Sequence, residues 1–311
     1  MKQMRQWLAA LWKFSRPHTI IGTSLSVWGL ALITLSVLSL SQGFLETLGQ
    51  WLPLIIGAWI PCLCGNVYIV GLNQLTDVGI DRINKPNLPL ASGAFSQREG
   101  VGIVSIAGLL ALLLAGFQGP YLLGMVAASL AIGTAYSLPP IRLKRFAFWA
   151  ALCIFGVRGV IVNLGLFWHF HQRWTGEAGV VPPQVWMLTA FIVVYTFAIA
   201  IFKDIPDLEG DLKFRIRTLT VRLGSQTVFK LALATIIFCY SGMIIAASLI
   251  LSLYPALLIG VSHIGLLLIL WRSSKNVNLR EQNTVRQFYQ LIWKLFFAEY
   301  ILFPLACFWG G

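Results

Sequence analysis

Two acidic stretches organise this chain, Asn73-Gln-Leu-Thr-Asp77-Val-Gly-Ile-Asp81 and Asp204-Ile-Pro-Asp207-Leu-Glu209-Gly-Asp211. Each follows a long apolar segment, and together they hold six of the eleven carboxylates of the chain. A carboxylate is costly to place beside an apolar environment, because it loses its hydration there. Acid concentrated in this way needs a positively charged partner.

The composition is that of an integral membrane protein. The 311 residues are 58% hydrophobic and 11% charged, with a mean hydropathy of +0.78, whereas soluble domains carry roughly 25% charged residues. The net charge of +12 would suggest nucleic acid in a soluble protein. Here the basic residues sit in short loops between apolar segments, so membrane topology explains them better and no nucleic-acid partner is expected.

Nine segments are long and apolar enough to cross a bilayer, which needs about 20 residues for each helix. The sequence therefore predicts an all-α polytopic membrane protein whose nine transmembrane helices enclose a central cavity. We place the spans at 19–40, 51–73, 99–116, 119–137, 147–167, 184–203, 228–249, 252–271 and 287–308. Residues 1–18 are expected to form a basic amphipathic segment on the membrane lipid surface, and 19–311 a single transmembrane domain.

The basic residues are distributed asymmetrically between the two sides of the predicted bundle. Twenty of the 23 Lys and Arg residues lie in the N-terminal segment and in alternate loops, whereas the opposite loops hold only Arg173. This bias places the N-terminus and both acidic stretches on the cytoplasmic or stromal side and the C-terminus on the other.

The second and sixth predicted spans run in the same direction, and each leads into an acidic stretch. The two stretches are about 130 residues apart, with four spans in each interval. This arrangement favours two four-helix pseudo-repeats plus a ninth helix, with a site at the interface between the halves.

The spacing within each stretch aims its carboxylates in one direction. Positions i, i+4 and i+8 in the first, and i, i+3 and i+7 in the second, form a stripe if the segment is helical. Gly79 and the segment 206–210 indicate that the helices bend there. Carboxylates about 6 Å apart repel by about 3 kcal/mol at an effective dielectric of 20, and magnesium, which prefers carboxylates, water and substrate phosphates, would offset this repulsion.

We therefore predict that two facing stripes hold a diphosphate through Mg²⁺, with basic side chains on the remaining phosphate oxygens. The alternative for one stretch alone is an ordinary polar loop at a membrane exit. Because two such stretches occur at corresponding positions on one side of the membrane, a metal site is favoured over two ordinary polar loops. The basic candidates are Arg82, Lys85, Lys203 and Lys213, together with Arg142 and Lys144, which also serve topology.

Metal and diphosphate within a membrane indicate a lipid diphosphate. If the diphosphate leaves from an allylic carbon, the metal draws off the leaving charge, and the π faces of Phe, Trp and Tyr can attract the allylic cation that remains.

The motifs resemble those of the UbiA-type intramembrane aromatic prenyltransferases, a nine-helix family. Asn73, Asp77 and Asp81 fit the family pattern Asn-x-x-x-Asp-x-x-x-Asp, and the second stretch fits Asp-x-x-Asp-x-x-x-Asp. Further matches are Ser15-Arg-Pro-His18, Asn84-Lys-Pro-Asn-Leu-Pro-Leu-Ala-Ser-Gly93, Tyr136-Ser-Leu-Pro-Pro-Ile-Arg-Leu-Lys-Arg145, Arg158-Gly-Val-Ile-Val-Asn-Leu-Gly-Leu-Phe167 and Phe202-Lys-Asp-Ile-Pro-Asp207. Together they resemble the homogentisate branch. Gln74, where relatives acting on 4-hydroxybenzoate have Asp, is consistent with that branch.

The resemblance implies transfer of a phytyl group from phytyl diphosphate to homogentisate with decarboxylation, giving 2-methyl-6-phytyl-1,4-benzoquinol, a tocopherol precursor, in a cyanobacterial plasma or thylakoid membrane. Solanesyl or geranylgeranyl transfer is the alternative within the branch. The implied catalytic and metal-binding residues are Asp77, Asp81, Asp204, Asp207 and Asp211, and Asn73 would orient a metal ligand or a phosphate.

Arg158 is the most informative single residue outside the acidic stretches. An arginine within a span costs about 2.5–3.5 kcal/mol on the insertion scale, so it is expected to pair with an acid of the site or to bind the carboxylate of homogentisate. A snorkelling side chain near the helix end is the alternative. Asn163, five residues on, is a further candidate for substrate binding.

A transporter of lipids or metabolites is the rival class. Transporters keep their ionisable residues near mid-membrane, whereas these stretches lie at one face. Magnesium-dependent release of diphosphate separates the two classes.

Overall fold

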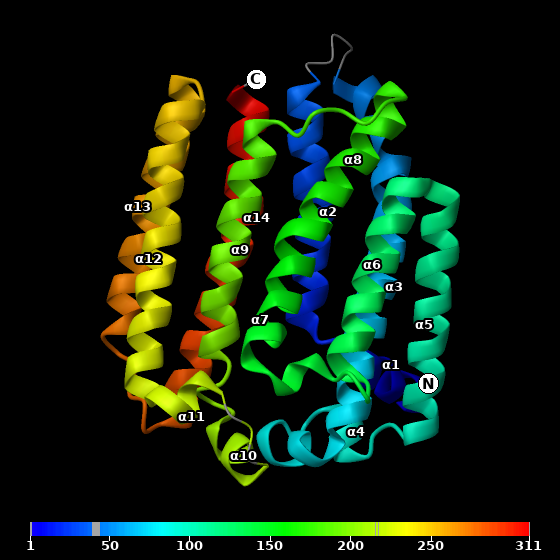
Figure 1. Cartoon of the computed structure of the whole chain (residues 1–311). Coiled ribbons are helices and arrows are strands. Elements are labelled where there is room, and N and C mark those ends of the chain that lie inside the picture. Colours follow the sequence, from blue (N-terminus) through cyan, green and yellow to red (C-terminus); the bar gives the residue numbers. More distant parts are fainter. Residues whose placement is uncertain (1, 39–43, 215, 217, 311) are drawn as a thin grey trace.

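Long helices that lie side by side make up the computed structural model, which describes all residues except 1, 39–43, 215, 217 and 311 (Figure 1). The described residues contain no strand. The α-helices, with the 3-10 turn η1 and the π turn η2, are α1 Lys2–Phe14, α2 Pro17–Val37, α3 Phe44–Asn84, α4 Pro89–Ser92, α5 Gln97–Gln118, α6 Pro120–Ser137, η1 Leu143–Arg145, α7 Ala147–Phe155, η2 Gly156–Ile161, α8 Val162–Thr175, α9 Pro183–Phe202, α10 Leu208–Lys213, α11 Leu219–Leu223, α12 Ser225–Ile250, α13 Leu253–Ser274 and α14 Gln282–Gly310.

The prediction of nine transmembrane helices is confirmed. Within the described ranges, nine helical segments are long and apolar enough to cross a membrane, and the fifth joins α7, η2 and α8 into one span, Phe148–Thr175. The N-terminus and the C-terminus lie at opposite ends of the bundle (Figure 1), as an odd number of spans requires.

The second span is longer than the sequence predicted. We expected it to end at residue 73, but α3 continues through the whole first acidic stretch to Asn84. Gly79 does not break the helix. Within α3 the backbone departs from helical geometry at Asp77, with φ −119° and ψ 16°. The bend is therefore located two residues before the expected glycine.

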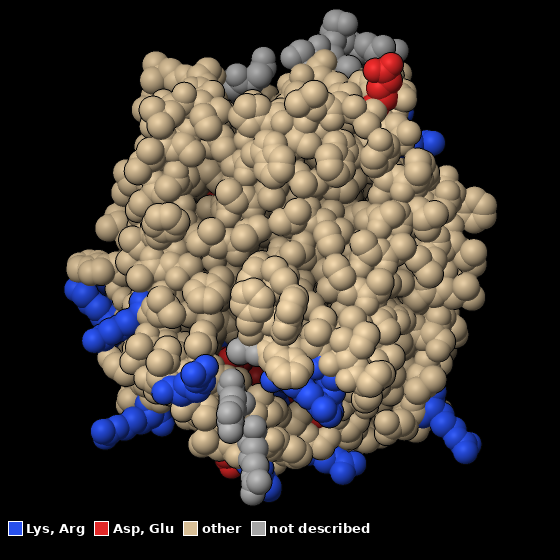
Figure 2. All heavy atoms as spheres, viewed as in Figure 1, with Lys and Arg blue, Asp and Glu red and all other residues tan. Residues whose placement is uncertain are grey.

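Charge is concentrated at one end of the molecule. Figure 2 shows Lys and Arg side chains gathered around the lower end, where Figure 1 places α4 and α10, and a broad uncharged belt above them. Several spans expose large apolar side chains, among them Ile106, Leu109, Phe117, Phe238 and Leu249. Apolar side chains that are exposed on many sides of a bundle are what contact with lipid tails requires.

The N-terminal helix α1 is separate from the first span. It exposes Met4, Trp7, Leu8 and Trp12, whereas Phe14 at its end is fully buried in a small cluster with residues of α3, α4 and α5. The end of α1 is thus fixed to the bundle, and the rest of the helix presents apolar side chains outward.

A buried contact between an imidazole and a carboxyl group joins the last two spans. His263 on α13 and Glu299 on α14 are both fully buried, and Nε2 of the imidazole lies 2.9 Å from Oε2 of the carboxyl group. Tyr240 of α12 lies edge-on to the imidazole, with 5.1 Å between the ring centres.

We expect Glu299→Ala to lower the free energy of unfolding by about 3 kcal/mol, because it leaves a buried imidazole without its partner. Thermal unfolding of the purified protein in detergent measures this effect. Glu281→Ala, which removes an exposed carboxylate just before α14, is the matched control and should leave the midpoint within about 1 °C, since surface changes alter stability little. Equal midpoints for both variants would show that the buried contact contributes nothing.

Candidate active site

A large cavity opens within the bundle, between the two acidic stretches. Its volume is about 1440 Å³, and its lining comes from α2, α3, α6, α7, η2, α9, α10 and α14 together with the segments between them. Such a volume is larger than the roughly 300–1,000 Å³ of ordinary small-molecule pockets. The cavity therefore has room for a long apolar substrate beside a second, smaller one.

The first acidic stretch faces this cavity from α3. Asn73, Asp77 and Asp81 all line it, because residues four apart on a helix lie one above another on the same face. The non-helical backbone at Asp77 bends the helix in the middle of this row. The amide of Asn73 and the carboxylates of Asp77 and Asp81 therefore all face the cavity.

The second acidic stretch is arranged differently, because α9 ends at Phe202 and α10 begins only at Leu208. Asp204 and Asp207 lie in the turn between the two helices, so the expected continuous helical stripe is not formed. Pro206 explains the break, since proline has no N–H for a helical hydrogen bond. Asp204, Asp207 and Asp211 nevertheless all line the cavity.

Two direct contacts join the second stretch to the residues that follow the first one. The Gly210 N–H donates a hydrogen bond of 3.0 Å to Oδ1 of Asn84 at the end of α3. A Cβ atom at position 210 would lie 2.2 Å from that oxygen, so only glycine permits this approach. Lys85, the next residue along, forms an ion pair with Asp207. The structure thus joins two segments that are more than a hundred residues apart in the chain.

Basic residues of the loop between α6 and α7 neutralise the first stretch. Nη2 of Arg142 lies 3.1 Å from Oδ1 of Asp77, and Nζ of Lys144 lies 2.7 Å from its Oδ2. Lys144 also donates to the Thr76 hydroxyl at 2.8 Å. Burial lowers the pKa of Lys144, although the neighbouring carboxylate of Asp77 opposes that shift. Both cations line the cavity and stand beside the acids that they neutralise.

Two carboxyl groups of the second stretch hold protons more strongly than usual. Burial raises the pKa of Asp204 to about 6 and that of Asp211 to about 7, because the charged form loses its hydration. Lys203 and Lys85 oppose both shifts. A cation bound beside these groups would therefore displace protons from them.

The carboxylates fit a magnesium site that substrate completes. Buried oxygens Oδ2 of Asp81 and Oδ2 of Asp211 have no hydrogen-bond partner among the described atoms, so each can ligate a cation. The described residues hold no cluster of three or more His, Cys, Asp or Glu that would form a metal site alone. Mg²⁺ is commonly bound through one or two carboxylates plus substrate phosphates and water, which is the ligand set that this arrangement provides.

Arg158 extends into the same cavity from the π turn η2. Its guanidinium carbon lies 5.3 Å from the ring centre of Trp293 and 5.6 Å from that of Phe296. It lies within 4 Å of no carboxylate in the described part of the chain, so of the two expected roles the geometry favours binding of a substrate anion. Aromatic faces stabilise this cation and leave its N–H groups available for an anion.

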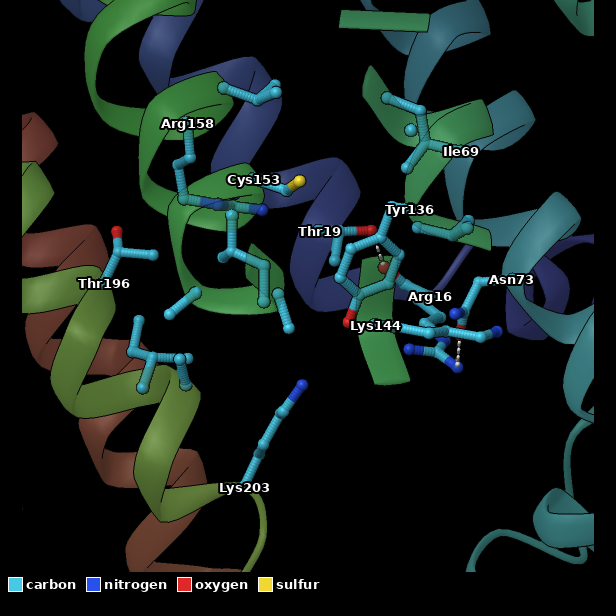
Figure 3. Close-up of a pocket in the computed structure, with 18 of the residues that line it drawn as sticks. Arg16, Thr19, Ile69, Asn73, Tyr136, Lys144, Cys153, Arg158, Thr196 and Lys203 are labelled. Atoms are coloured by element: carbon cyan, nitrogen blue, oxygen red, sulfur yellow. Dashed lines mark hydrogen bonds between the residues drawn. The ribbon is translucent and has the colours of Figure 1, made fainter. Parts of the chain in front are cut away.

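The cations stand on two sides of the cavity. Figure 3 shows Lys203 and Arg158 on one side, with Arg16, Asn73 and Lys144 on the other. The side chain of Lys203 points from the end of α9 toward the space between them. An anion in this space would meet positive charge from both halves of the bundle.

Two predicted substrate-binding residues lie elsewhere. Arg82 is exposed and does not line the cavity. It is the next residue after Asp81, so its side chain points about 100° around the helix axis from that of Asp81. Asn163 is fully buried and also lies outside the lining. Its Oδ1 accepts a hydrogen bond of 2.9 Å from the Tyr300 hydroxyl, so its amide links α8 to α14.

Arg16 lines the cavity but was not among the predicted site residues. Its Nη2 donates to Oδ1 of Asn73 over 3.4 Å. The sequence analysis assigned Arg16 only to the basic residues that determine membrane topology. It lies, however, in one of the stretches that carry the family resemblance. Tyr136, at the end of α6, is a second lining residue that sequence reasoning did not select.

Comparisons with known proteins agree with this geometry. Residues 24–298 match the model of the UbiA prenyltransferase family. The chain is 52% identical to homogentisate phytyltransferase of Synechocystis, over 96% of both chains. It is 38% identical to homogentisate phytyltransferase 1 of Arabidopsis thaliana (97% of this chain and 76% of the relative) and 36% identical to homogentisate geranylgeranyltransferase of Hordeum vulgare (96% and 72%).

Solved structures share the fold at lower sequence identity. A UbiA homolog from Archaeoglobus fulgidus bound to GPP and Mg²⁺ matches with a TM-score of 0.59 and 16% identity, over 96% of this chain and 99% of that one. The apo structure of a UbiA homolog from Aeropyrum pernix matches with a TM-score of 0.66 and 19% identity, over 93% and 96%. With its nine spans, its two facing acidic motifs and these matches, the chain belongs to the UbiA prenyltransferase family.

Proposed function

We propose that this protein transfers a phytyl group from phytyl diphosphate to homogentisate, with loss of carbon dioxide, and that the reaction depends on Mg²⁺. The observation that carries the proposal is that both acidic motifs line one cavity that also holds Arg158, which pairs with no carboxylate among the described residues. The 52% identity to the Synechocystis homogentisate phytyltransferase supports the choice of substrates. The product would be 2-methyl-6-phytyl-1,4-benzoquinol.

The acidic and basic side chains at the end of the cavity that carries both motifs would bind the diphosphate. Asp77, Asp81, Asp204, Asp207 and Asp211 would hold Mg²⁺, directly or through water. When bound, the metal ions supply positive charge that stabilises the leaving diphosphate. The chain's own cations add to this charge: Lys203 from α9, Lys144 and Arg142 from the loop after α6, and Lys85 next to the second motif. Asn73 would orient a phosphate or a metal-bound water.

The reaction then proceeds by cleavage of the bond between the allylic carbon and the diphosphate oxygen. A carbon of the homogentisate ring supplies the electron pair for the new carbon–carbon bond. The carboxyl group of the acetate side chain leaves as carbon dioxide, and the methylene carbon that remains takes up one proton to become the methyl group, which balances the proton lost from the ring. Aromatic side chains that line the cavity, such as Tyr136 and Tyr289, would present π faces to the allylic cation.

Arg158 is placed to bind the carboxylate of the acceptor. It lines the cavity, and the guanidinium group is stacked on two rings rather than neutralised by an acid. Gly159 beside it allows the π turn to approach α9, since a Cβ there would lie 2.4 Å from the Val193 side chain. The turn thus fixes the guanidinium on the wall of the cavity opposite Asn73 (Figure 3).

We also propose that the end with the acidic motifs faces the cytoplasm or the stroma and that α1 lies on the lipid surface of that side. The concentration of Lys and Arg at this end (Figure 2) supports the orientation, because positively charged loops are retained on the cytoplasmic side. The exposed Trp7 and Trp12 of α1 suit the interface of a bilayer.

We expect membranes containing the protein to convert labelled homogentisate and phytyl diphosphate to a prenylated quinol only when Mg²⁺ is present. EDTA should abolish the product, and added Mg²⁺ should restore it. In competition, phytyl diphosphate should be preferred to geranylgeranyl and solanesyl diphosphates. A preference for geranylgeranyl or solanesyl diphosphate would assign the protein to another activity of the homogentisate branch. If no donor gives a product, a transporter would be favoured.

Asp77→Asn and Asp207→Asn should each lower kcat at least about 100-fold, because each removes a negative charge of the metal site while conserving its shape. Glu209→Gln is the matched control. Glu209 belongs to the second acidic stretch but is exposed and does not line the cavity, so its variant should keep nearly full activity. If Glu209→Gln loses as much activity as the aspartate variants, the assignment of the metal ligands is wrong.

For the acceptor site, Arg158→Met should raise the KM for homogentisate about tenfold or more, since a charge-assisted hydrogen bond to a carboxylate contributes about 1.5–3 kcal/mol. The KM for phytyl diphosphate should change little. Arg173→Met, at the exposed far end of the same span, should affect neither constant. An unchanged KM for homogentisate in Arg158→Met would refute the carboxylate role.

A further inference from the structure

The junction between α1 and α2 carries an unusual backbone conformation. Arg16 has φ 52° and ψ 87°, a left-handed conformation that residues with a side chain rarely adopt. Strained residues of this kind persist only where the surroundings fix them, and they concentrate at functional sites. The question is which contacts of the bundle keep this arginine in place.

Gln74 supplies a buried contact to this junction. Its Nε2 donates a hydrogen bond of 2.6 Å to the carbonyl oxygen of Phe14, and it lies 3.4 Å from that of Val70. Both partners are carbonyl oxygens, which only accept, so the nitrogen of the amide must face them. The side chain of Gln74 is fully buried and does not line the cavity. It therefore acts on the backbone of the junction and not on a substrate.

Close packing reinforces the same contact. Gly71 lies one turn before Gln74, and a Cβ there would be 2.7 Å from the ring of Phe14. The absence of a side chain at Gly71 lets the fully buried Phe14 settle against α3. Asn66 also donates to the Ser15 carbonyl, over 3.3 Å. The chain just before Arg16 is thus held on α3 at two consecutive residues.

The junction aims Arg16 at the first acidic motif. Its Nη2 donates to Asn73 at 3.4 Å, and its buried Nε has no hydrogen-bond partner among the described atoms. Figure 3 places its guanidinium group beside Asn73 and Lys144, at the wall of the cavity. The group therefore has donors left for an anion that enters between the motifs.

We propose that Gln74 is a positioning residue: its hydrogen bond to Phe14 holds Arg16 in the left-handed conformation that directs the guanidinium onto the diphosphate of the substrate. The identity of the anion rests on the function proposed above. The alternative role of Gln74 is structural, in which it only satisfies a buried carbonyl group. The two roles differ in one measurable respect, since a positioning residue has no effect on diphosphate binding once Arg16 has been removed.

The test measures binding of inorganic diphosphate, with Mg²⁺ present, to the purified full-length protein in detergent by isothermal titration calorimetry. The variants are Gln74→Met, Arg16→Met and the double variant. Gln74→Met keeps the volume but loses the donor, and we expect it to weaken binding about tenfold. In the Arg16→Met background the same change should have no further effect, which is the non-additivity expected of residues that act as one unit.

Tyr68→Phe is the matched control. It removes a hydrogen bond of 2.7 Å to Thr134 from the same helix α3, and Tyr68 does not line the cavity. Binding of diphosphate should be unchanged in this variant. If Gln74→Met does not fold, Gln74→Asn, whose shorter amide cannot reach the Phe14 carbonyl, carries the same expectation.

An equal loss of affinity in both backgrounds would overturn the proposal, and so would unchanged affinity in Gln74→Met or in Arg16→Met. Product formation by the wild-type protein is measured in parallel. Binding of diphosphate without any prenylated product would overturn the proposed function and leave the positioning role to be decided by the calorimetry. If the wild-type protein forms product but the losses of affinity in Gln74→Met and Arg16→Met add up in the double variant, the positioning role is overturned and the proposed function stands.

Discussion

The balance of charge around the acidic motifs is the constraint on which the rest of the structure depends. Five aspartates line one cavity at the end of an apolar bundle, and their mutual repulsion is greater there than in water. The protein offsets part of it with its own cations, so that Asp77 contacts Arg142 and Lys144 while Asp207 contacts Lys85. The remaining acids keep free oxygens on Asp81 and Asp211. Neutralisation is thus incomplete in the protein alone, and a metal ion with its anionic substrate would complete it.

This constraint also explains how distant segments are joined. The cations that neutralise the motif of α3 come from the loop after α6, and the motif after α9 is paired with a lysine that follows α3. Each motif therefore depends on charge that another part of the chain supplies. The Asn84–Gly210 hydrogen bond adds a neutral contact at the same place. Such reciprocal contacts make the site a property of the assembled bundle and not of any one helix.

Much of this could be predicted from the sequence, because the features involved are local. Hydropathy and length predicted the nine spans, and helical spacing placed Asn73, Asp77 and Asp81 on one face. The bend at Asp77 could not be located, because no breaker residue marks it. The contact of Asn163 with Tyr300 could not be foreseen, because the two residues lie 137 positions apart in the chain. Arg16 was overlooked because a basic residue before a span has an ordinary topological explanation, and only its backbone conformation and its contact with Asn73 distinguish it.

The π turn that carries Arg158 has a consequence for how this span can vary. Each turn of the i→i+5 type accommodates one residue more than a regular α-helical turn, so η2 places α7 and α8 out of phase by about one position. Loss of one residue between 156 and 161 would let the span return to regular α-helix with its two halves facing as before, whereas loss of one residue within α7 or α8 would rotate one half against the other by about 100°. The length of this span should therefore be able to change by one residue at the π turn, but not within the helices on either side of it.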